Sequence, residues 1–255
     1  MPVAKIRVFR FDPSVDREPR YETYSLPYER RARIITLIER LQREYCDLSF
    51  VEACRSRMCG LCGARVNGKP VLLCWEEAEP VMTVDPLPNF EVIRDLVVDR
   101  RSYEARKAAL LRLLGYDESH PLPETVREED FARVKLEGMV LNKIQADQCI
   151  ECLLCHSVCP AVKIFPRFVG PALATRIAKA VFDPRMEGRI DYGRLFPMLY
   201  GCTECFGCVE VCPVGIKPVV LIKKALRQAV KAMAVDERGV RVAHVMRVLK
   251  GSFRG

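Results

Sequence analysis

The first hundred residues switch between a strand pattern and a helix pattern. Apolar and polar residues alternate over residues 5–11 (KIRVFRF) and again over 21–26 (YETYSL), which predicts two strands joined by a polar, proline-containing turn. A helix is expected over about residues 30–45. Its apolar positions follow helical spacing: Ile34, Ile35, Leu37, Ile38 and Leu41.

Turn signals organise the rest of this half. Asn67-Gly68 predicts a short hairpin that leads to Cys74. Three prolines follow and indicate turns or loops: Pro80, Pro86 and Pro88. We therefore expect a compact α+β domain over residues 1–100.

Helical spacing dominates after residue 100. Helices are expected over 103–114, 128 to about 143, 171–181 and 218–233. In the last of these, five apolar residues share one face: Ile222, Ala225, Leu226, Ala229 and Met233. Such stripes are typical of core packing, so we expect an α-helical domain over residues 101–255.

Composition excludes several classes of protein. Of 255 residues, 49% are hydrophobic and 29% charged, so the chain can bury a core and is not disordered. The longest charge-free run, residues 152–162, is too short to span a bilayer. No signal-peptide core is visible at the start, so we expect a cytoplasmic protein. In that reducing compartment, 13 cysteines favour metal binding over disulfides.

The net charge of +8 comes almost entirely from the residues after Pro218. A basic tail can bind nucleic acid, but no helix-turn-helix, zinc-finger or stacking-aromatic pattern accompanies it here. The alternative is a solvated helix face that offsets anionic clusters or docks a partner. We favour this second interpretation and expect no nucleic acid.

The first cysteine group has the plant-type spacing for a [2Fe–2S] cluster, C-x4-C-x2-C-x11-C. Its members are Cys54, Cys59, Cys62 and Cys74. Gly60 and Gly63 would supply the backbone freedom that a tight cluster loop needs. Zinc is the alternative, but zinc sites usually use two separated cysteine pairs.

Two further groups each have the bacterial-ferredoxin spacing C-x2-C-x2-C-x3-C-P, in which the fourth cysteine ligates the other cluster. One predicted cluster is therefore a [4Fe–4S] cluster held by Cys149, Cys152, Cys155 and Cys212. The other takes Cys159, Cys202, Cys205 and Cys208. The remaining Cys46, at the end of the first predicted helix, is interpreted as a buried structural thiol.

Other candidate chemistry is sparse. His156 follows Cys155 directly, and because four thiolates complete the ligand set we expect it to lie at the surface or beside the ligands. No P-loop, dinucleotide fingerprint, Ser/His/Asp arrangement or paired-carboxylate motif can be placed. We expect no catalytic residues in this chain.

Several segments together resemble the iron–sulfur subunit of the succinate dehydrogenase/fumarate reductase family over nearly the whole length. They are KIRVFRFDP…PRYETY, ACRSRMCGLC (53–62), NGK (67–69), PLPNFEVIRDLVVDR (86–100), the two Cys-Pro runs and FVGPA (168–172). The resemblance implies a subunit that carries single electrons between an FAD-containing flavoprotein, which handles succinate or fumarate, and a quinone or other acceptor. The resemblance also implies that residues 1–100 form a plant-type ferredoxin domain with the β-grasp fold, whose [2Fe–2S] cluster would face the flavin.

Two departures from the family pattern concern the third cluster and the electron acceptor. Many members have an aliphatic residue in place of Cys205 and hold a [3Fe–4S] cluster; here Cys205 predicts a second [4Fe–4S] cluster. The serine, aromatic and histidine residues of quinone-reducing members are absent: Ala161 and Val162 follow Pro160, and Thr203 follows Cys202.

The resemblance also bears on partners and location. Members with the extra cysteine often work with a cysteine-rich acceptor subunit in place of the usual membrane anchor. Because the sequence contains no predicted membrane span, peripheral attachment to the cytoplasmic face of the membrane is expected to come through partner subunits. The alternative function is a three-cluster subunit of a thiol- or heterodisulfide-linked, or other, flavoprotein oxidoreductase.

Overall fold

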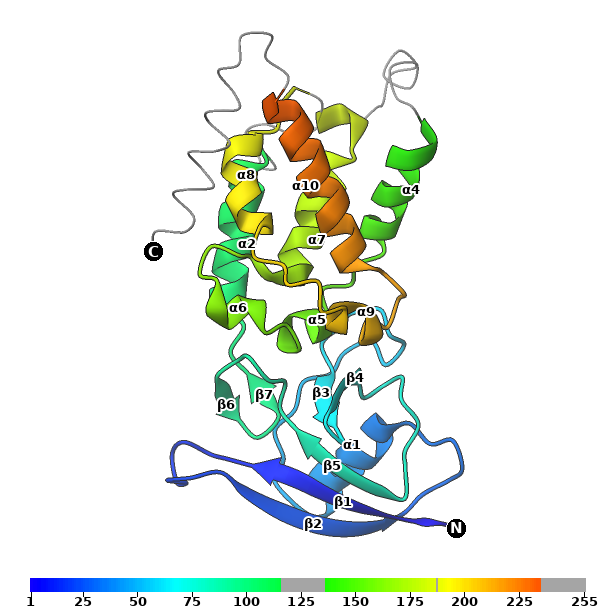
Figure 1. Ribbon diagram of the computed structural model, residues 1–255. Coiled ribbons are helices and arrows are strands. Elements are labelled where there is room, and N and C mark those ends of the chain that lie inside the picture. The colour runs from blue at the N-terminus through cyan, green and yellow to red at the C-terminus, as the bar shows by residue number, and fades with distance from the viewer. Residues whose placement is uncertain (116–135, 187, 235–255) are drawn as a thin grey trace. The chain divides into compact units, whose positions relative to one another are not determined.

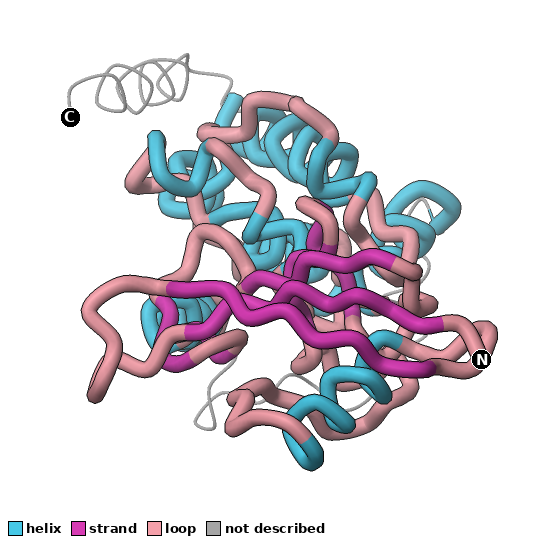
Figure 2. Tube along the Cα trace, turned by 90° about the horizontal axis from the view of Figure 1, so that it is seen from below, coloured by secondary structure: helices cyan, strands magenta, loops and turns pink. Residues whose placement is uncertain are grey.

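A five-stranded sheet forms the centre of the first hundred residues in this computed structural model (Figure 2). Its strands run in the order β2-β1-β5-β3-β4. The strands are β1 (Val3–Arg10), β2 (Arg20–Pro27), β3 (Gly63–Val66), β4 (Lys69–Leu72) and β5 (Val81–Asp85). The β1–β5 pair is parallel and the other pairs are antiparallel. Two short strands, β6 (Val92–Arg94) and β7 (Val97–Val98), pair separately.

Helix α1 (Ile34–Glu44) shares one hydrophobic core with the sheet. Alternation along β1 buries Ala4, Ile6 and Val8, while the five predicted apolar positions of α1 are all buried. The predicted strands, helix and Asn67-Gly68 hairpin are thus confirmed within a few residues. Strand β5 was not predicted, although Met82 and Val84 are fully buried in the same core.

A buried carboxylate ties the start of the chain to the 86–100 segment. Asp95 accepts hydrogen bonds from Arg10 Nε (3.0 Å) and from the backbone N–H groups of Phe11 (3.0 Å) and Ser49 (2.8 Å). Because Ser49 precedes the first cysteine loop, this network anchors that loop to the end of β1.

The second half of the chain is helical (Figure 1). Its elements are α2 (Arg101–Leu113), α4 (Leu136–Asp147), α5 (Leu154–Ser157), α6 (Ala161–Ile164), α7 (Gly170–Val181), a 3-10 turn (Pro184–Met186), α8 (Tyr192–Leu199), α9 (Gly207–Glu210) and α10 (Pro218–Ala234). Helix α7 is buried at ten of its twelve residues and packs against α4, α8 and α10.

The predicted apolar face of α10 is confirmed: Leu226 is half-buried and the other four residues are buried. The helix expected over 128–143 lies partly in α4, and its residues before 136 lie outside the described residues. Helix α8 was not predicted; Asp191 caps it by accepting from the Arg194 N–H (3.1 Å), and Pro197 lies inside it.

The structure describes residues 1–115, 136–186 and 188–234, and the chain divides into two compact units. Unit 1 is Met1–Arg101, Ile150–Val158 and Glu210–Pro213; unit 2 is Ser102–Cys149, Cys159–Val209 and Val214–Gly255. The predicted division into domains 1–100 and 101–255 stays a prediction. Among the described residues, no helix combines the length and apolar character needed to cross a bilayer.

Candidate metal centres

The first cysteine group lies in unit 1: three members are in the loop between α1 and β3, and Cys74 is two residues after the end of β4. The loop winds tightly because Arg55, Arg57 and Gly60 adopt left-handed backbone conformations, with φ of 55°, 59° and 69°. Three backbone N–H groups thereby reach Cys54 Sγ: those of Ser56 (3.4 Å), Met58 (3.2 Å) and Cys59 (3.2 Å).

These hydrogen bonds lower the pKa of Cys54 to about 6, because donors stabilise the thiolate. Cys62 and Cys74 are buried instead. Burial raises the pKa of Cys62 to about 12, and the neighbouring Cys74 and Cys59 contribute to this shift. The loop therefore combines converging thiols with N–H donors aimed at sulfur, which fits an anionic iron–sulfur cluster.

The sequence-based interpretation of the two loop glycines is correct for Gly60 and wrong for Gly63. Gly63 opens β3 and is not among the residues with positive φ. Its lack of a side chain matters for packing, since a Cβ there would lie 3.0 Å from Leu87 Cδ1 and 3.3 Å from Leu154 Cδ2. The residues that share the left-handed role with Gly60 are arginines, a type that does not signal this conformation.

The segment that carries Cys152 and Cys155 belongs to unit 1, as does the segment that carries Cys212. Cys149 immediately precedes the first of these segments. A Cβ added at Gly60 would lie 2.7 Å from Ile150 O and 2.8 Å from Cys152 Cα. The first cysteine loop is thus in direct backbone contact with the second cysteine run.

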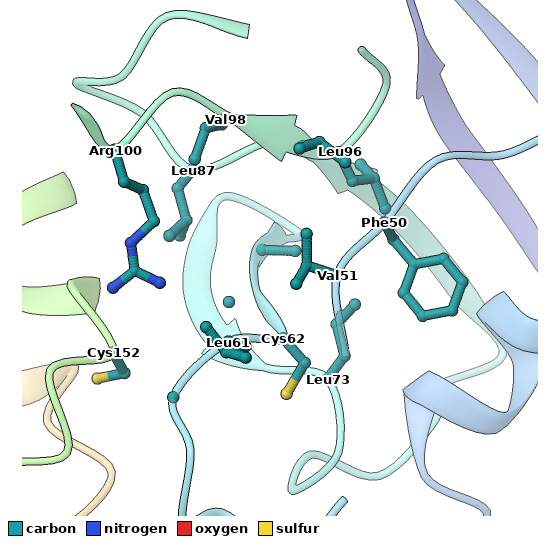
Figure 3. A pocket seen from close by; sticks show the side chains of 14 residues that line it. Phe50, Val51, Leu61, Cys62, Leu73, Leu87, Leu96, Val98, Arg100 and Cys152 are labelled. Carbon is teal, nitrogen blue, oxygen red and sulfur yellow. The ribbon is translucent and has the colours of Figure 1, made fainter. Parts of the chain in front are cut away.

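A pocket in unit 1 borders this contact. Cys62 and Cys152 border one pocket with apolar side chains that include Leu61 and Leu87 (Figure 3). Arg100 also lines the pocket, and its guanidinium donates to Glu151 O (2.8 Å). Arg57 Nη1 donates to Pro213 O (3.0 Å), beside Cys212.

The third group lies entirely within unit 2, where Cys159, Cys202, Cys205 and Cys208 line one pocket. Nearby backbone groups act to lower the pKa of three of these thiols: those of Ala161 and Val162 for Cys159, that of Glu204 for Cys202, and that of Val219, at the start of α10, for Cys208. Burial raises the pKa of Cys208 to about 11 and also raises those of Cys159 and Cys202. Cys205 is exposed.

The two ferredoxin-type runs share one backbone pattern. Glu151 (φ 52°) and Glu204 (φ 55°) occupy equivalent positions, as do Leu153 (φ 63°) and Phe206 (φ 62°). All four are left-handed, so the chain bends in the same way at matching positions of the two runs. None of these residue types signals the conformation in the sequence.

Among the described residues, no group of three His, Cys, Asp or Glu side chains gathers as the ligands of a single ion would. Cluster ligands do not gather in this way, because each thiolate of a [4Fe–4S] cluster binds a different iron and each iron of a [2Fe–2S] cluster takes only two thiolates.

The two residues outside the cysteine sets lie close to their expected positions. Cys46 follows α1 and is half-buried, and its thiol donates to Leu41 O (3.7 Å). Burial raises its pKa. The His156 ring is half-buried, 5.4 Å from the Phe90 ring. The structural role of Cys46 stays a prediction.

Comparisons with known proteins decide the family. A model described as "2Fe-2S iron-sulfur cluster binding domain" matches residues 5–105, and one described as "4Fe-4S dicluster domain" matches residues 145–216. The fumarate reductase iron-sulfur subunit of Haemophilus influenzae is 31% identical, over 92% of this chain and 96% of its own length. This chain belongs to the succinate dehydrogenase/fumarate reductase iron–sulfur subunit family.

Other relatives extend the likeness. A fumarate reductase (CoM/CoB) subunit from Methanothermobacter marburgensis is 33% identical over 82% of this chain, which spans 40% of that protein. A chain of the solved structure "Mycobacterium smegmatis Sdh1 complex in the apo form" matches with a TM-score of 0.72 and 27% identity, over 93% of this chain and 99% of that one.

The predicted family, fold class and cluster-binding domains are therefore confirmed: a [2Fe–2S] domain with a sheet precedes a helical [4Fe–4S] dicluster domain. The relatives are oxidoreductase subunits by name. The individual ligands and the type of the third cluster stay predictions.

Proposed function

We propose that this iron–sulfur subunit relays single electrons between a flavoprotein that handles succinate or fumarate and a second acceptor. The observation that carries the proposal is the contact of Gly60 with Ile150 and Cys152 in unit 1. It brings the loop of the first cysteine group against the second cysteine run. Two redox centres that exchange electrons need such a short path through protein.

The proposed ligand sets are those that the spacing predicts. The [2Fe–2S] cluster would be held by Cys54, Cys59, Cys62 and Cys74, and the middle [4Fe–4S] cluster by Cys149, Cys152, Cys155 and Cys212. The third would be held by Cys159, Cys202, Cys205 and Cys208. When bound, such clusters accept and release single electrons. The chain's own residues hold the sulfurs and aim N–H groups at them.

A surface beside the first loop supports a flavoprotein partner. Trp75 follows Cys74 directly and is 41% exposed, with the Arg57 guanidinium 3.8 Å from its ring centre. Met58 and Leu61, from the loop itself, are exposed as well. Exposed apolar side chains of this kind, mixed with arginine, are typical of protein interfaces.

The remaining partners are proposed by family likeness. The relatives are named as subunits, so we infer a complex that also contains a membrane-anchor or cysteine-rich acceptor subunit. That subunit would hold this one at the cytoplasmic face of the membrane. The names succinate dehydrogenase and fumarate reductase favour this function over the thiol- or heterodisulfide-linked alternative.

The test is to isolate the native complex anaerobically and add succinate while recording cluster absorbance and EPR spectra. Reduction of the clusters within the turnover time is expected. Reduction by dithionite but not by succinate would overturn the proposed substrate while leaving the electron-transfer role intact. The flavoprotein that co-purifies would then identify the reaction.

The identity of the third cluster has a separate test at Cys205. We expect about ten irons per wild-type chain and about nine in Cys205→Ala, which should acquire the EPR signal of an oxidised [3Fe–4S] cluster. Cys46→Ala is the matched control and should keep all its iron. A wild-type chain with about nine irons and a [3Fe–4S] spectrum would contradict the proposal.

A further inference from the structure

An ion pair borders the third cysteine group in unit 2. Lys223 Nζ on α10 lies 2.7 Å from Glu204 Oε2. The two side chains are 41% and 49% exposed, so neither is cut off from water. Glu204 stands between Cys202 and Cys205 and is one of the left-handed residues of the run.

Both partners of this pair belong to elements that form the site. Glu204 lies between Cys202 and Cys205 in the chain. Val219 and Ile222 of α10 line the same pocket as the four cysteines, and Ile222 is the neighbour of Lys223. The positions of the two charges are therefore fixed by the elements that form the site.

The two charges act on the cysteine run in opposite directions. Glu204 directly precedes Cys205 in the chain, and its carboxylate holds the Lys223 ammonium at 2.7 Å, so both charges lie beside the run. Electron transfer to a cluster at this place adds negative charge. An ammonium favours the added charge and a carboxylate disfavours it.

We propose that the Glu204–Lys223 ion pair sets the reduction potential of the cluster held by Cys159, Cys202, Cys205 and Cys208. This inference rests on the ligand set of the proposed function. Neither side chain touches a reacting atom in this scheme. Both are positioning residues, which act through their charge beside the cysteine run.

The neighbouring Lys224 provides a matched control. It is the same residue type, one position further along α10, but its ammonium lies 2.7 Å from Asn142 Oδ1 on α4. Removing this charge changes the net charge of the chain as much as removing Lys223 does. Only Lys223 contacts the cysteine run.

The experiment is a potentiometric titration of the full chain carrying its clusters, with dithionite and mediators, followed by EPR. Lys223→Gln should lower the potential of the third cluster and Glu204→Gln should raise it. At the wild-type midpoint, the ratio of reduced to oxidised cluster should change by about threefold in each direction, as for an exposed charge pair. The double variant should return near the wild-type ratio.

Three further results are expected. Lys223→Arg should keep the wild-type potential, Lys224→Gln should leave it unchanged, and the other two clusters should not respond to any of these variants. Shifts of the same sign in both single variants would indicate a loosened structure and overturn the proposal, as would no shift in either.

The titration uses no succinate, so it separates this inference from the proposed substrate. Opposite shifts in a complex that succinate fails to reduce would leave the ion pair's role standing. A wild-type chain without a third cluster signal would overturn both the ligand set and this inference.

Discussion

Cys54 and Cys62 belong to one loop, yet their backbone surroundings push their thiols in opposite directions. Three N–H donors hold the pKa of Cys54 at about 6, whereas burial raises that of Cys62 to about 12. The difference depends on the left-handed conformations of Arg55 and Arg57, which turn the donors inward. At neutral pH and without a cluster, Cys54 is therefore mainly a thiolate and Cys62 is a protonated thiol.

This contrast predicts an unequal response of the cluster-free chain to an alkylating reagent. The reactive form is the thiolate, so modification of Cys54 by iodoacetamide should rise with pH and reach half its maximal rate near pH 6. Cys62 should stay unmodified through neutral pH. Peptide mass spectrometry after short pulses at a series of pH values measures both.

Cys46 is the internal control for this experiment. Burial raises its pKa, and in the described part of the chain no backbone N–H group is seen to donate to its sulfur. It should remain unmodified at pH 7. Half-maximal modification of Cys54 near the ordinary thiol value of about 8.5 would contradict the prediction.

At the scale of elements, the first cysteine loop depends on a close approach that only glycine permits. Gly60 combines a φ of 69° with backbone neighbours less than 3 Å from where a Cβ would stand. Gly68, in the β3–β4 hairpin, has a φ of 84° but nothing within 4 Å of that position. Both glycines have a positive φ, which alanine adopts with difficulty. Of the two, Gly60 alone would also bring a Cβ into a clash with neighbouring backbone atoms.

Gly60→Ala should therefore destabilise the chain more than Gly68→Ala does. The left-handed conformation alone disfavours alanine by about 1–2 kcal/mol, and the clash at Gly60 adds roughly 1–3 kcal/mol. Anaerobic thermal unfolding measures the difference. Gly60→Ala should also weaken the EPR spin coupling between the first and middle clusters, since the loop must retreat from Cys152.

Equal melting temperatures for the two variants would contradict this account of the loop. Unchanged spin coupling in Gly60→Ala would mean that the contact with Cys152 does not set the separation of the two clusters.

Elements with simple periodicity could be predicted from the sequence, and elements that depend on tertiary pairing could not. The alternation in β1 and the stripe on α10 are local signals, and the structure contains both. Strand β5 is short, lies between Pro80 and Pro86, and is held by its parallel pairing with β1. Helix α8 contains Pro197, a residue that counts against helix in any single-sequence argument.

At the scale of the whole molecule, the cysteine spacing predicted the family and fold class correctly because iron–sulfur chemistry needs several thiolates at fixed intervals. It could not predict the backbone conformation that positions the thiols. That conformation depends on left-handed residues at Glu151, Leu153, Glu204 and Phe206, where side-chain type carries no signal.

The matched backbone of the two runs has a consequence for how such subunits change over generations. The path of the chain around Cys205 is set by left-handed residues on either side, Glu204 and Phe206, and Cys205 itself is exposed. We expect a substitution at this one codon to alter the iron count while leaving the surrounding chain path in place. A lineage would then exchange a [4Fe–4S] cluster for a [3Fe–4S] cluster, or the reverse, through a single mutation and without passing through a sequence that cannot fold.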